Sequence, residues 1–383
     1  MKNRKSVVFL TLLLVMAVLL SSCGLVQVNE EKDRKITVAK VNGEDILKGN
    51  LIDLYNMYYG QTEEYDKDVM TSMLDNLIEE ELVKQKTAAA GHVINEEIEA
   101  QAKKEFDQEI EEHAENLKEQ AEEDADPDTD YLQLARDEMN EYLESAGLTE
   151  EVYIKEAAEY IIIQNYLDEL TEGLSVDDKE IEEYYQKELD SQLEYPSMSA
   201  YYSSVPIVTE PAMRRVKHIL LMLADEDAKS IQALRQEDKD EDADKMREEK
   251  LEAIKGKAEA VLAETKTNED FESLIIKHGE DPGMEAEENK DGYTMYRDAS
   301  MYEEFLTASF ELKEGEISEL VATDVGYHII KVYEATEDVI ASLEDVKEVI
   351  QTTLLNQKKS EKIDELVKGW LEEADIKKYE NRL

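Results

Sequence analysis

The chain of 383 residues is poor in cysteine, histidine, proline and basic side chains, and each shortage limits what it can be. Its one cysteine, Cys23, excludes a disulfide within the chain. Lys and Arg number 43 against 94 Asp and Glu, so the formal net charge is −51. A surface this acidic repels phosphate groups, which argues against binding of nucleic acid. The acidic excess fits solubility alone, or else an affinity for cationic partners or ions.

The first residues have the order of a secretion signal. Three basic residues precede an apolar run, Val7–Leu20, which is too short for a comfortable membrane span. The sequence LSSC then ends at Cys23 and resembles the lipobox of bacterial lipoproteins. We therefore expect residues 1–22 to be a signal peptide, Cys23 to be lipidated, and residues 23–35 to be a tether. The alternative is an ordinary secretory signal in which the cysteine is accidental.

Residues 36–212 are expected to form a largely helical region. The alternation in Ile36–Val41, followed by Asn42 and Gly43, predicts a small hairpin. Apolar residues then recur at helical spacing, most clearly from Met70 to Leu82. One helix is expected to end at Gly91, and further helices are expected to begin at Asn95, Asp130 and Thr149.

A change of composition ends the helical region. Three of the five prolines fall within Glu194–Arg215, and proline breaks both helices and strand ladders. Beyond this boundary the pattern predicts four strands and three helices. The strands are expected at Val216–Leu221, Tyr293–Tyr296, Ile317–Val321 and Tyr327–Tyr333, and the helices at Lys250–Thr265, after an N-cap at Asn268, and at Tyr302–Leu312.

Two of the five histidines interrupt strands that otherwise resemble core. His218 lies in RRVKHILLM and His328 lies in GYHIIKV, 110 residues further on. A polar, titratable ring inside an apolar strand needs a hydrogen-bond partner. The two histidines are therefore the first candidates for a functional site.

Five segments resemble, in order and at nearly the same spacing, the motifs of parvulin-type peptidyl-prolyl isomerases. They are VKHILL, FESLIIKHGEDPG, DGYTMY, MYEEFLTASFELKEGEIS and VATDVGYHIIKV. The likeness covers about Met213–Glu334. Upstream, KVNGEDI, AAAGHVINEEIEA and LSVDDKEIEEYYQKEL resemble the N-terminal part of SurA- and PrsA-type chaperones. With the lipobox, the whole chain resembles a PrsA-type foldase lipoprotein.

The resemblance implies an α+β fold, in which a parvulin-like four-stranded antiparallel sheet with surrounding helices is inserted in a mostly α-helical SurA/PrsA-like chaperone domain. It divides the chain into an N-terminal chaperone domain at 36–212, an isomerase domain at 213–335 and a C-terminal segment at 336–383. The apolar-striped helix of this last segment, which includes Trp370, would fold back and complete the chaperone domain.

The resemblance also implies site residues. In the family, two strand histidines lie side by side beneath the substrate site, and these correspond to His218 and His328. Asp281 matches the family's catalytic Cys or Asp, and Thr323 matches a threonine that links the histidines to the network. The residues that correspond to the proline pocket are Tyr293, Met301 and Phe305. Neither a metal nor a cofactor is expected. The alternative is that the histidines only satisfy each other in the core.

The sequence departs from the family pattern in its middle turn and in the segment after the first strand. The turn NKDGYTMY has only Gly292 where the family usually has two glycines before Asp-Leu-Gly, although Asn and Asp tolerate turn geometry. Ala224–Asp244 is expected to be a flexible acidic loop, which disfavours phosphoserine-proline substrates. Asp124–Asp130 spaces its acids like a calcium loop but lacks the required Gly and Glu.

Two functions compete on this basis. The first is a foldase, anchored by lipid to the extracytoplasmic face of the cell membrane, that isomerises X-Pro bonds in secreted proteins. The second is a holdase chaperone with a degenerate parvulin domain that no longer turns over. An anchored solute-binding lipoprotein would need repeated α/β units that the sequence lacks. Both leading hypotheses name unfolded or newly secreted polypeptides as partners, and a homodimer is considered with them.

Overall fold

The computed structural model describes residues 32–60, 62, 64–121, 129–145, 148–267 and 270–383. The predicted signal peptide and Cys23 lie outside these residues, as does most of Asp124–Asp130. In the described part of the chain, no helix has the length and apolar character needed to cross a membrane. Contacts divide the chain into a helical unit, Met1–Leu174 with Asn356–Leu383, and a sheet unit, Ser175–Leu355. These units do not decide the predicted domain borders, which stay a prediction.

The helical unit contains a small three-stranded sheet of order β2-β1-β9. Asn42 and Gly43 both have positive φ, at 51° and 100°, as a two-residue hairpin turn requires. The predicted hairpin is therefore confirmed. Val41 pairs with Glu44 on one side and with Ile376 on the other. The strands are β1 Thr37–Val41, β2 Glu44–Leu47 and β9 Ile376–Lys378.

Helices form the rest of this unit, and side-chain caps fix where several begin. The Asn95 side chain accepts from two backbone N–H groups of the first turn, and two helices later the Thr149 side chain accepts from Val152 N. Asp130 accepts from Gln133 N at 3.0 Å, so all three predicted starts are confirmed. The helices are α3 Lys48–Tyr59, α4 Lys67–Ala89, α5 Glu96–Glu119, α6 Tyr131–Ser145, α7 Glu150–Leu170 and the second half of α14 Leu343–Glu373.

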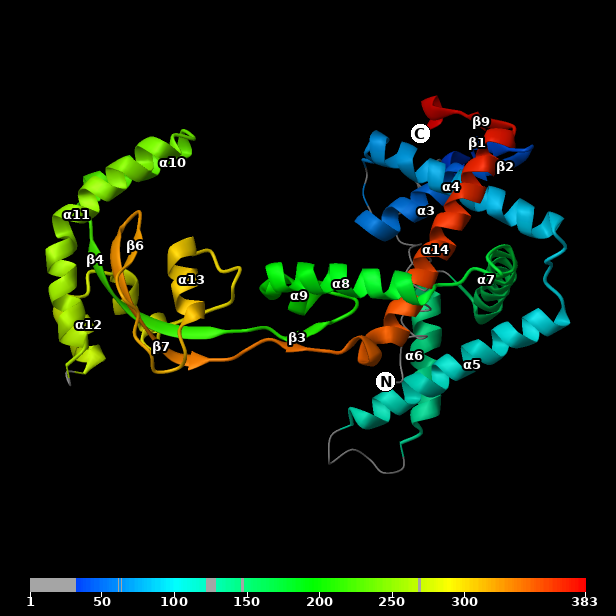
Figure 1. The fold of residues 1–383 in the computed structure, drawn as a ribbon. Coiled ribbons are helices and arrows are strands. Elements are labelled where there is room, and N and C mark those ends of the chain that lie inside the picture. The colour runs from blue at the N-terminus through cyan, green and yellow to red at the C-terminus, as the bar shows by residue number, and fades with distance from the viewer. Residues whose placement is uncertain (1–31, 61, 63, 122–128, 146–147, 268–269) are drawn as a thin grey trace. The chain divides into compact units, whose positions relative to one another are not determined.

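The apolar residues of α14 serve two separate cores. Its first part buries Val346 and Ile350 in a cluster with Ile181 and Ile207 of the sheet unit. Its last part packs Trp370 against the core of the helical unit, around the fully buried residues Val38, Val41, Leu51, Leu74 and Leu82. The predicted apolar stripe of this helix is therefore present, but its first and last parts belong to the cores of different units (Figure 1).

The sheet unit is built on a four-stranded antiparallel sheet of order β5-β4-β7-β6, as predicted. The predicted strand at Ile317–Val321 is wrong, because Ile317 makes only an isolated bridge to Lys331. The Ser318 hydroxyl accepts from Ile330 N and replaces a backbone partner there. The strands are β4 Arg214–Met222, β5 Tyr293–Met295, β6 Val321–Thr323 and β7 Gly326–Ala335.

The acidic segment Ala224–Asp244 is not a loop. It forms α10 and the first turn of α11, which therefore begins ten residues before the predicted Lys250. Buried Ile231, Ala243 and Leu251 supply the apolar contacts that order it. The predicted cap Asn268 lies outside the described residues, and Asp270 is the N-cap of α12. The helices are α8 Asp178–Glu194, α9 Pro196–Tyr202, α10 Asp225–Gln236, α11 Asp240–Thr265, α12 Phe271–His278 and α13 Glu303–Glu311.

Helices cover both faces of the four-stranded sheet (Figure 1). On one face, Ile219, Leu221 and Ile329 pack against α11 and α12. On the other face, Val216 and Ile330 pack against Phe305 of α13 and its neighbours. Because side chains alternate along a strand, the even-numbered residues of β4 and β7 face α13.

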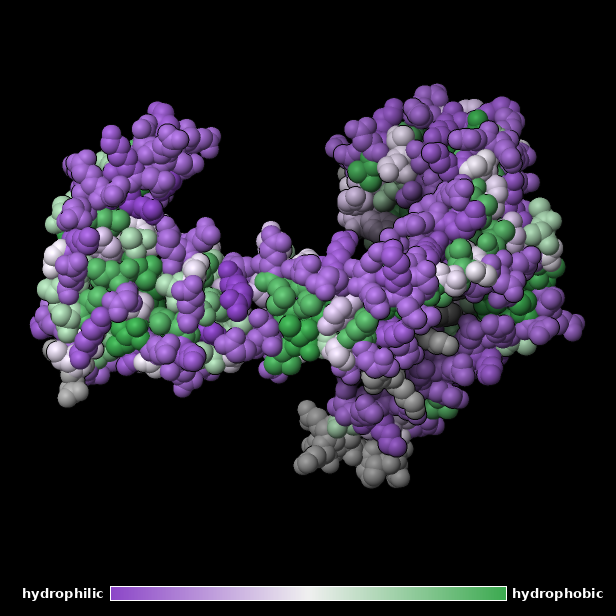
Figure 2. Space-filling view, in the orientation of Figure 1, coloured by the Kyte–Doolittle hydropathy of each residue, from purple (hydrophilic) through white to green (hydrophobic). Residues whose placement is uncertain are grey.

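A short two-stranded ribbon pairs β3 Val208–Glu210, which precedes the four-stranded sheet in the chain, with β8 Val339–Ile340, which comes after it. Figure 2 shows green apolar surface over the α9 and β3 segment. Met198 of α9 and Val339 and Ile340 of β8 are exposed large apolar residues of this part of the chain. An apolar surface this open is a place where another polypeptide can bind.

Candidate active site

The strand register explains why the two histidines meet. Leu220 pairs with His328, and His218 pairs with Ile330. The histidines are thus diagonal neighbours on the same face of an antiparallel pair, within reach of each other's rings. Both are buried, and their ring centroids lie 5.0 Å apart.

The buried rings belong to one line of hydrogen bonds. Nδ1 of His218 lies 3.0 Å from Nδ1 of His328, whose Nε2 lies 2.9 Å from the hydroxyl of Thr323. On the other side, Nε2 of His218 lies 2.7 Å from Oδ2 of Asp281. The Tyr293 hydroxyl donates to the same oxygen at 2.9 Å. The structure therefore brings five of the seven predicted site residues into one connected network.

The proton positions in this line follow from its chemistry. Burial, followed by the nearby His218, lowers the pKa of His328 to about 3, so His328 is neutral. When His218 is neutral and its Nε2–H donates to Asp281, its Nδ1 must accept from Nδ1–H of His328. Nε2 of His328 then accepts from the Thr323 hydroxyl. In that state each ring is held in one tautomer by its neighbours.

Asp281 is positioned by a tight turn after α12. Its carboxylate caps a short 3₁₀ helix, Pro282–Glu285, and accepts from Gly283 N at 2.9 Å. Burial opposes its ionisation, but the hydrogen bonds from His218, Gly283 and Tyr293 prevail and lower the pKa of Asp281 to about 2. The pKa of Tyr293 is raised, through burial and its bond to the carboxylate. Asp281 is therefore a fixed anion at neutral pH.

Gly283 is a site residue that sequence reasoning missed. A Cβ at this position would collide with the Tyr293 hydroxyl, so no larger residue can stand here while that hydroxyl reaches Asp281. The sequence signal was available, because Gly283 ends the quoted GEDPG motif. Only the folded structure shows that its smallness serves Tyr293.

Aromatic and apolar side chains cover the network. The Phe305 ring packs edge-on against both His218 and His328, with centroids 5.1 Å from each. Phe305 of α13 is 3% exposed, whereas Met301, which precedes α13, is 41% exposed. Tyr293 packs edge-on against His218 from β5. Phe305 thus forms the floor beside the polar network, and Met301 stands at the surface.

The other three histidines do not join this site. His92, His113 and His278 each lie within 3 Å of one glutamate, respectively Glu169, Glu138 and Glu264. In the residues that the structure describes, no group of three or more His, Cys, Asp or Glu is arranged to hold a metal ion.

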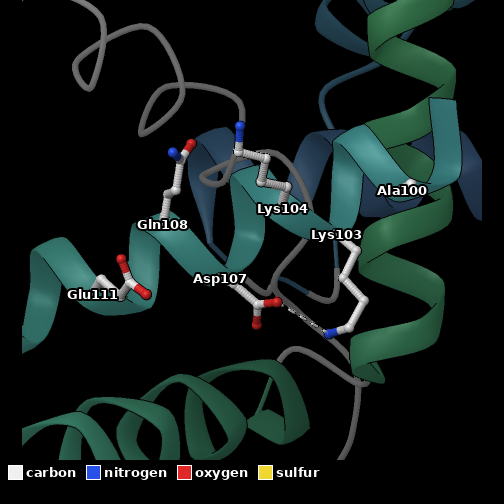
Figure 3. A pocket seen from close by; sticks show the side chains of 6 residues that line it. All are labelled: Ala100, Lys103, Lys104, Asp107, Gln108 and Glu111. Carbon is white, nitrogen blue, oxygen red and sulfur yellow. Dashed lines mark ion pairs between the residues drawn. The ribbon is translucent and has the colours of Figure 1, made fainter. Parts of the chain in front are cut away.

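A separate hollow of about 510 Å³ lies on α5 in the helical unit (Figure 3). Two of its charged side chains form ion pairs: Lys103 lies 3.5 Å from Asp107 and 3.0 Å from Glu150. Asp107 also accepts from Arg136 at 3.0 Å. The residues that line it are Ala100, Lys103, Lys104, Asp107, Gln108 and Glu111. All of these residues belong to α5, so the hollow lies in the helical unit and shares no residue with the histidine network.

Comparison with known proteins finds a family model that matches the segment holding the site. Residues 218–334 match the model of the rotamase family, described as a PPIC-type PPIase domain. The chain is 26% identical over 399 positions to the foldase protein PrsA of Clostridium botulinum strain Hall, with all of both chains covered. PrsA of Clostridium kluyveri is also 26% identical, over 403 positions and all of both chains.

Two solved structures are also similar. A SurA-like chaperone structure from Campylobacter jejuni is 18% identical with a TM-score of 0.34, and the match covers 90% of this chain and 100% of that one. PrsA from Bacillus subtilis is 20% identical with a TM-score of 0.21, covering 88% and 93%. The family model and the PrsA sequences confirm the predicted resemblance to PrsA-type foldases and the predicted enzyme class, a parvulin-type peptidyl-prolyl isomerase. They support a foldase or chaperone role toward unfolded polypeptides.

Proposed function

We propose that this PrsA-like chain is an extracytoplasmic foldase that catalyses cis–trans isomerisation of X-Pro bonds in secreted proteins and assists their folding. The observation that carries the proposal is the continuous polar network from Thr323 to Asp281, beneath Phe305, within the segment that matches the PPIC-type domain.

The geometry suits a reaction in which no bond is broken. A prolyl amide rotates over a barrier of about 20 kcal/mol, and its cis and trans forms are close in energy. A catalyst must hold the proline ring and favour the twisted amide, in which resonance is lost. Met301, Phe305 and Tyr293 supply the apolar contacts for the ring in this proposal. A preorganised anion needs no rearrangement when the amide twists.

The polar residues of the network have different roles in this proposal. The Asp281 side chain is 17% exposed, whereas that of its partner His218 is 6% exposed, so a substrate can reach the carboxylate more easily than the imidazole. We assign Asp281 the electrostatic role at the twisted amide. His218, His328 and Thr323 hold its carboxylate and the sheet face in place. These buried groups therefore contribute to catalysis mainly through position and stability.

A holdase function is the second candidate, and one observation favours it. Phe305 is almost completely buried, so the apolar floor gives a proline ring little open surface. The exposed apolar residues Met198, Val339 and Ile340 could bind unfolded clients without any turnover. The isomerase assay below separates the two functions.

The assay follows isomerisation of a prolyl peptide by the full chain, by protease coupling or by NMR exchange. Asp281→Ala should lower kcat/KM by about 10- to 100-fold, because a preorganised charge is lost. Met301→Ala should weaken peptide binding. His218→Ala and His328→Ala should lower the melting temperature more than the rate. Asp291→Ala, an exposed acid of the neighbouring turn, is the matched control.

The outcomes distinguish the candidates. A wild-type chain that suppresses client aggregation without isomerase activity is a holdase. An Asp281→Ala variant with full rate rejects the site assignment.

The membrane anchor is a further part of the proposal, supported by the LSSC sequence. In cells, metabolic labelling with palmitate should mark the wild-type chain, and Cys23→Ala should be unlabelled and either unprocessed or shed. Label that persists in Cys23→Ala rejects lipidation at this residue. Sedimentation of the purified chain tests the homodimer that the proposal retains.

A further inference from the structure

Asp324 stands next to the histidine network without belonging to it. It follows Thr323 in the turn between β6 and β7, and its side chain is 19% exposed. Arg235 reaches both of its carboxylate oxygens, with Nε at 3.1 Å and Nη2 at 3.3 Å. Arg247 approaches to 3.7 Å. This forked contact fixes the carboxylate in position and in orientation.

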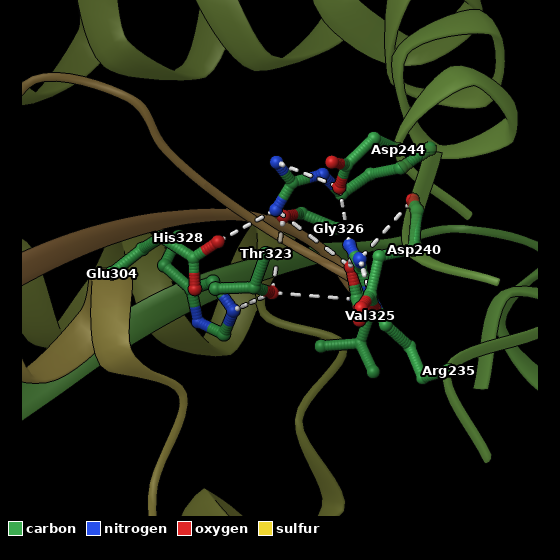
Figure 4. Close-up of polar contacts among 10 residues, drawn as sticks. Arg235, Asp240, Asp244, Glu304, Thr323, Val325, Gly326 and His328 are labelled. Carbon is green, nitrogen blue, oxygen red and sulfur yellow. Dashed lines mark hydrogen bonds and ion pairs between the residues drawn. The ribbon is translucent and has the colours of Figure 1, made fainter. Parts of the chain in front are cut away.

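The arginine comes from the acidic helices. Arg235 lies in the last turn of α10 and also pairs with Asp240 at 3.0 Å and Asp244 at 2.5 Å, both in α11 (Figure 4). Arg247 of α11 pairs in turn with Glu304 of α13 at 2.6 Å. A single guanidinium therefore ties α10, α11 and the β6–β7 turn together.

The turn has little freedom to adjust. Leu223 N donates to Val325 O at 2.8 Å, and Val325 N donates to the Thr323 hydroxyl oxygen at 3.3 Å. Gly326 has a φ of 149°, and a Cβ there would collide with the carbonyl of Leu221. The position of the Thr323 hydroxyl, 2.9 Å from Nε2 of His328, is thus set by the turn as a whole.

We propose that Arg235 and Asp324 are positioning residues for the isomerase site. By holding the turn against α10, they keep the Thr323 hydroxyl on His328 and so fix the tautomers of both histidines. The acidic helices α10 and α11 are in this way coupled to the network that orients Asp281. The inference rests on the proposed function for its effect on rate, but not for its effect on the histidines.

An ordinary surface ion pair would predict little. Such pairs contribute about 0–1 kcal/mol to stability and leave distant side chains unchanged. The Arg235–Asp324 pair differs because one partner adjoins, in sequence, a fully buried threonine of the network. Its loss removes the side-chain contact that holds the turn against α10, next to the hydroxyl that must be positioned.

The experiment uses the full chain labelled with ¹⁵N histidine. Asp324→Asn keeps the side-chain shape and removes the charge. It should shift the imidazole ¹⁵N resonances of His328, change its tautomer ratio, and lower kcat/KM by about 3- to 10-fold, the scale of coupling through a packed network. Asp240→Asn is the matched control, because it removes a carboxylate from the same arginine without touching the turn. It should leave the resonances and the rate at wild-type values.

A double-mutant cycle completes the test. Arg235→Met should reproduce the effect of Asp324→Asn, and the double variant should be no worse than either single variant. Unchanged His328 resonances in Asp324→Asn overturn the proposal, as do equal effects of Asp324→Asn and Asp240→Asn. If the wild-type chain shows no isomerase activity, the proposed function fails, and the resonances alone still decide the positioning role.

Discussion

The two units bury different kinds of side chain. The sheet unit buries a connected set of polar groups, from Thr323 through both histidines to Asp281, within one sheet face. The helical unit buries only the polar residues Asn56, Thr87 and Thr171 among those described, and its two histidines pair with glutamates at the surface. Removing one member of a buried polar network lowers stability strongly, because the remaining members are left without hydrogen-bond partners. An apolar core loses stability in smaller, more independent steps.

The difference indicates where each kind of function belongs. Chemistry at an amide needs fixed polar groups, and these are concentrated in the sheet unit. Binding of unfolded chains needs exposed apolar surface, and the residues proposed to bind clients, Met198, Val339 and Ile340, lie outside the isomerase segment 213–334. The following predictions test this contrast, beginning with the largest effect.

The largest effect is expected from removing the isomerase segment, residues 213–334. Met213 and Thr336 exchange two backbone hydrogen bonds, at 3.3 and 3.0 Å, so the two ends of the segment are adjacent. Replacing residues 213–334 with a short linker should therefore abolish isomerase activity and leave the helical unit folded. Circular dichroism and light scattering with an aggregating client check this prediction. A variant that is unfolded, or that no longer suppresses aggregation, contradicts an independent helical unit.

Lowering the pH should destabilise the sheet unit through protonation of His328. Its pKa is lowered to about 3 by folding, so between about pH 6.5 and pH 3 the unfolded chain binds a proton that the folded chain refuses. Stability from this group is thus present above pH 6.5 and lost as the pH falls. Asp281, with a pKa lowered to about 2, adds a loss between about pH 3.8 and pH 2.

The variant His328→Gln isolates this contribution. At pH 7 it should melt about 5 °C below the wild type, because a buried network is broken. The gap should narrow as the pH falls towards 4, since glutamine carries no acid penalty. Calorimetric melts of both chains across this range check the prediction, with His113→Gln at the surface as the control. A gap that stays constant or widens in acid contradicts it.

The smallest effect concerns the approach of the substrate. α10 follows β4, the strand that carries His218, and begins with the exposed acids Asp225 and Glu226; exposed charges act over about 8–10 Å at ordinary salt. Prolyl peptides flanked by Lys or Arg should be turned over about 3-fold faster than Glu-flanked or phosphoserine peptides at low salt. The preference should shrink at high salt and in the double variant Asp225→Asn with Glu226→Gln. Equal kcat/KM for basic and acidic peptides at low salt rejects the steering role.

Local patterns made much of the fold predictable. The Asn42-Gly43 turn, the Asn95 cap and the two histidine strands all depend on short-range rules, and the structure agrees with each. The acidic segment Ala224–Asp244 was wrongly predicted to be a loop. Its many charges drew attention away from Ile231 and its apolar neighbours, whose helical spacing makes the segment helical.

The site was predictable only as far as the family resemblance reached. The residues of the network carry motif signals, whereas Gly283 matters only for the hydroxyl that folding brings near it. The pairing of Arg235 with Asp324 joins residues 89 positions apart and leaves no local pattern. Contacts of this kind are set by how helices pack on the sheet.

The pairing of β1 with β9 has a consequence for the order in which the protein is made. Val41 and Ile376 are partners in one small sheet, although more than three hundred residues separate them in the chain. During synthesis β1 emerges early and must wait for β9, while the sheet unit is complete as soon as Leu355 has emerged. The isomerase segment can therefore finish folding before β9 pairs with β1 and completes the small sheet of the helical unit.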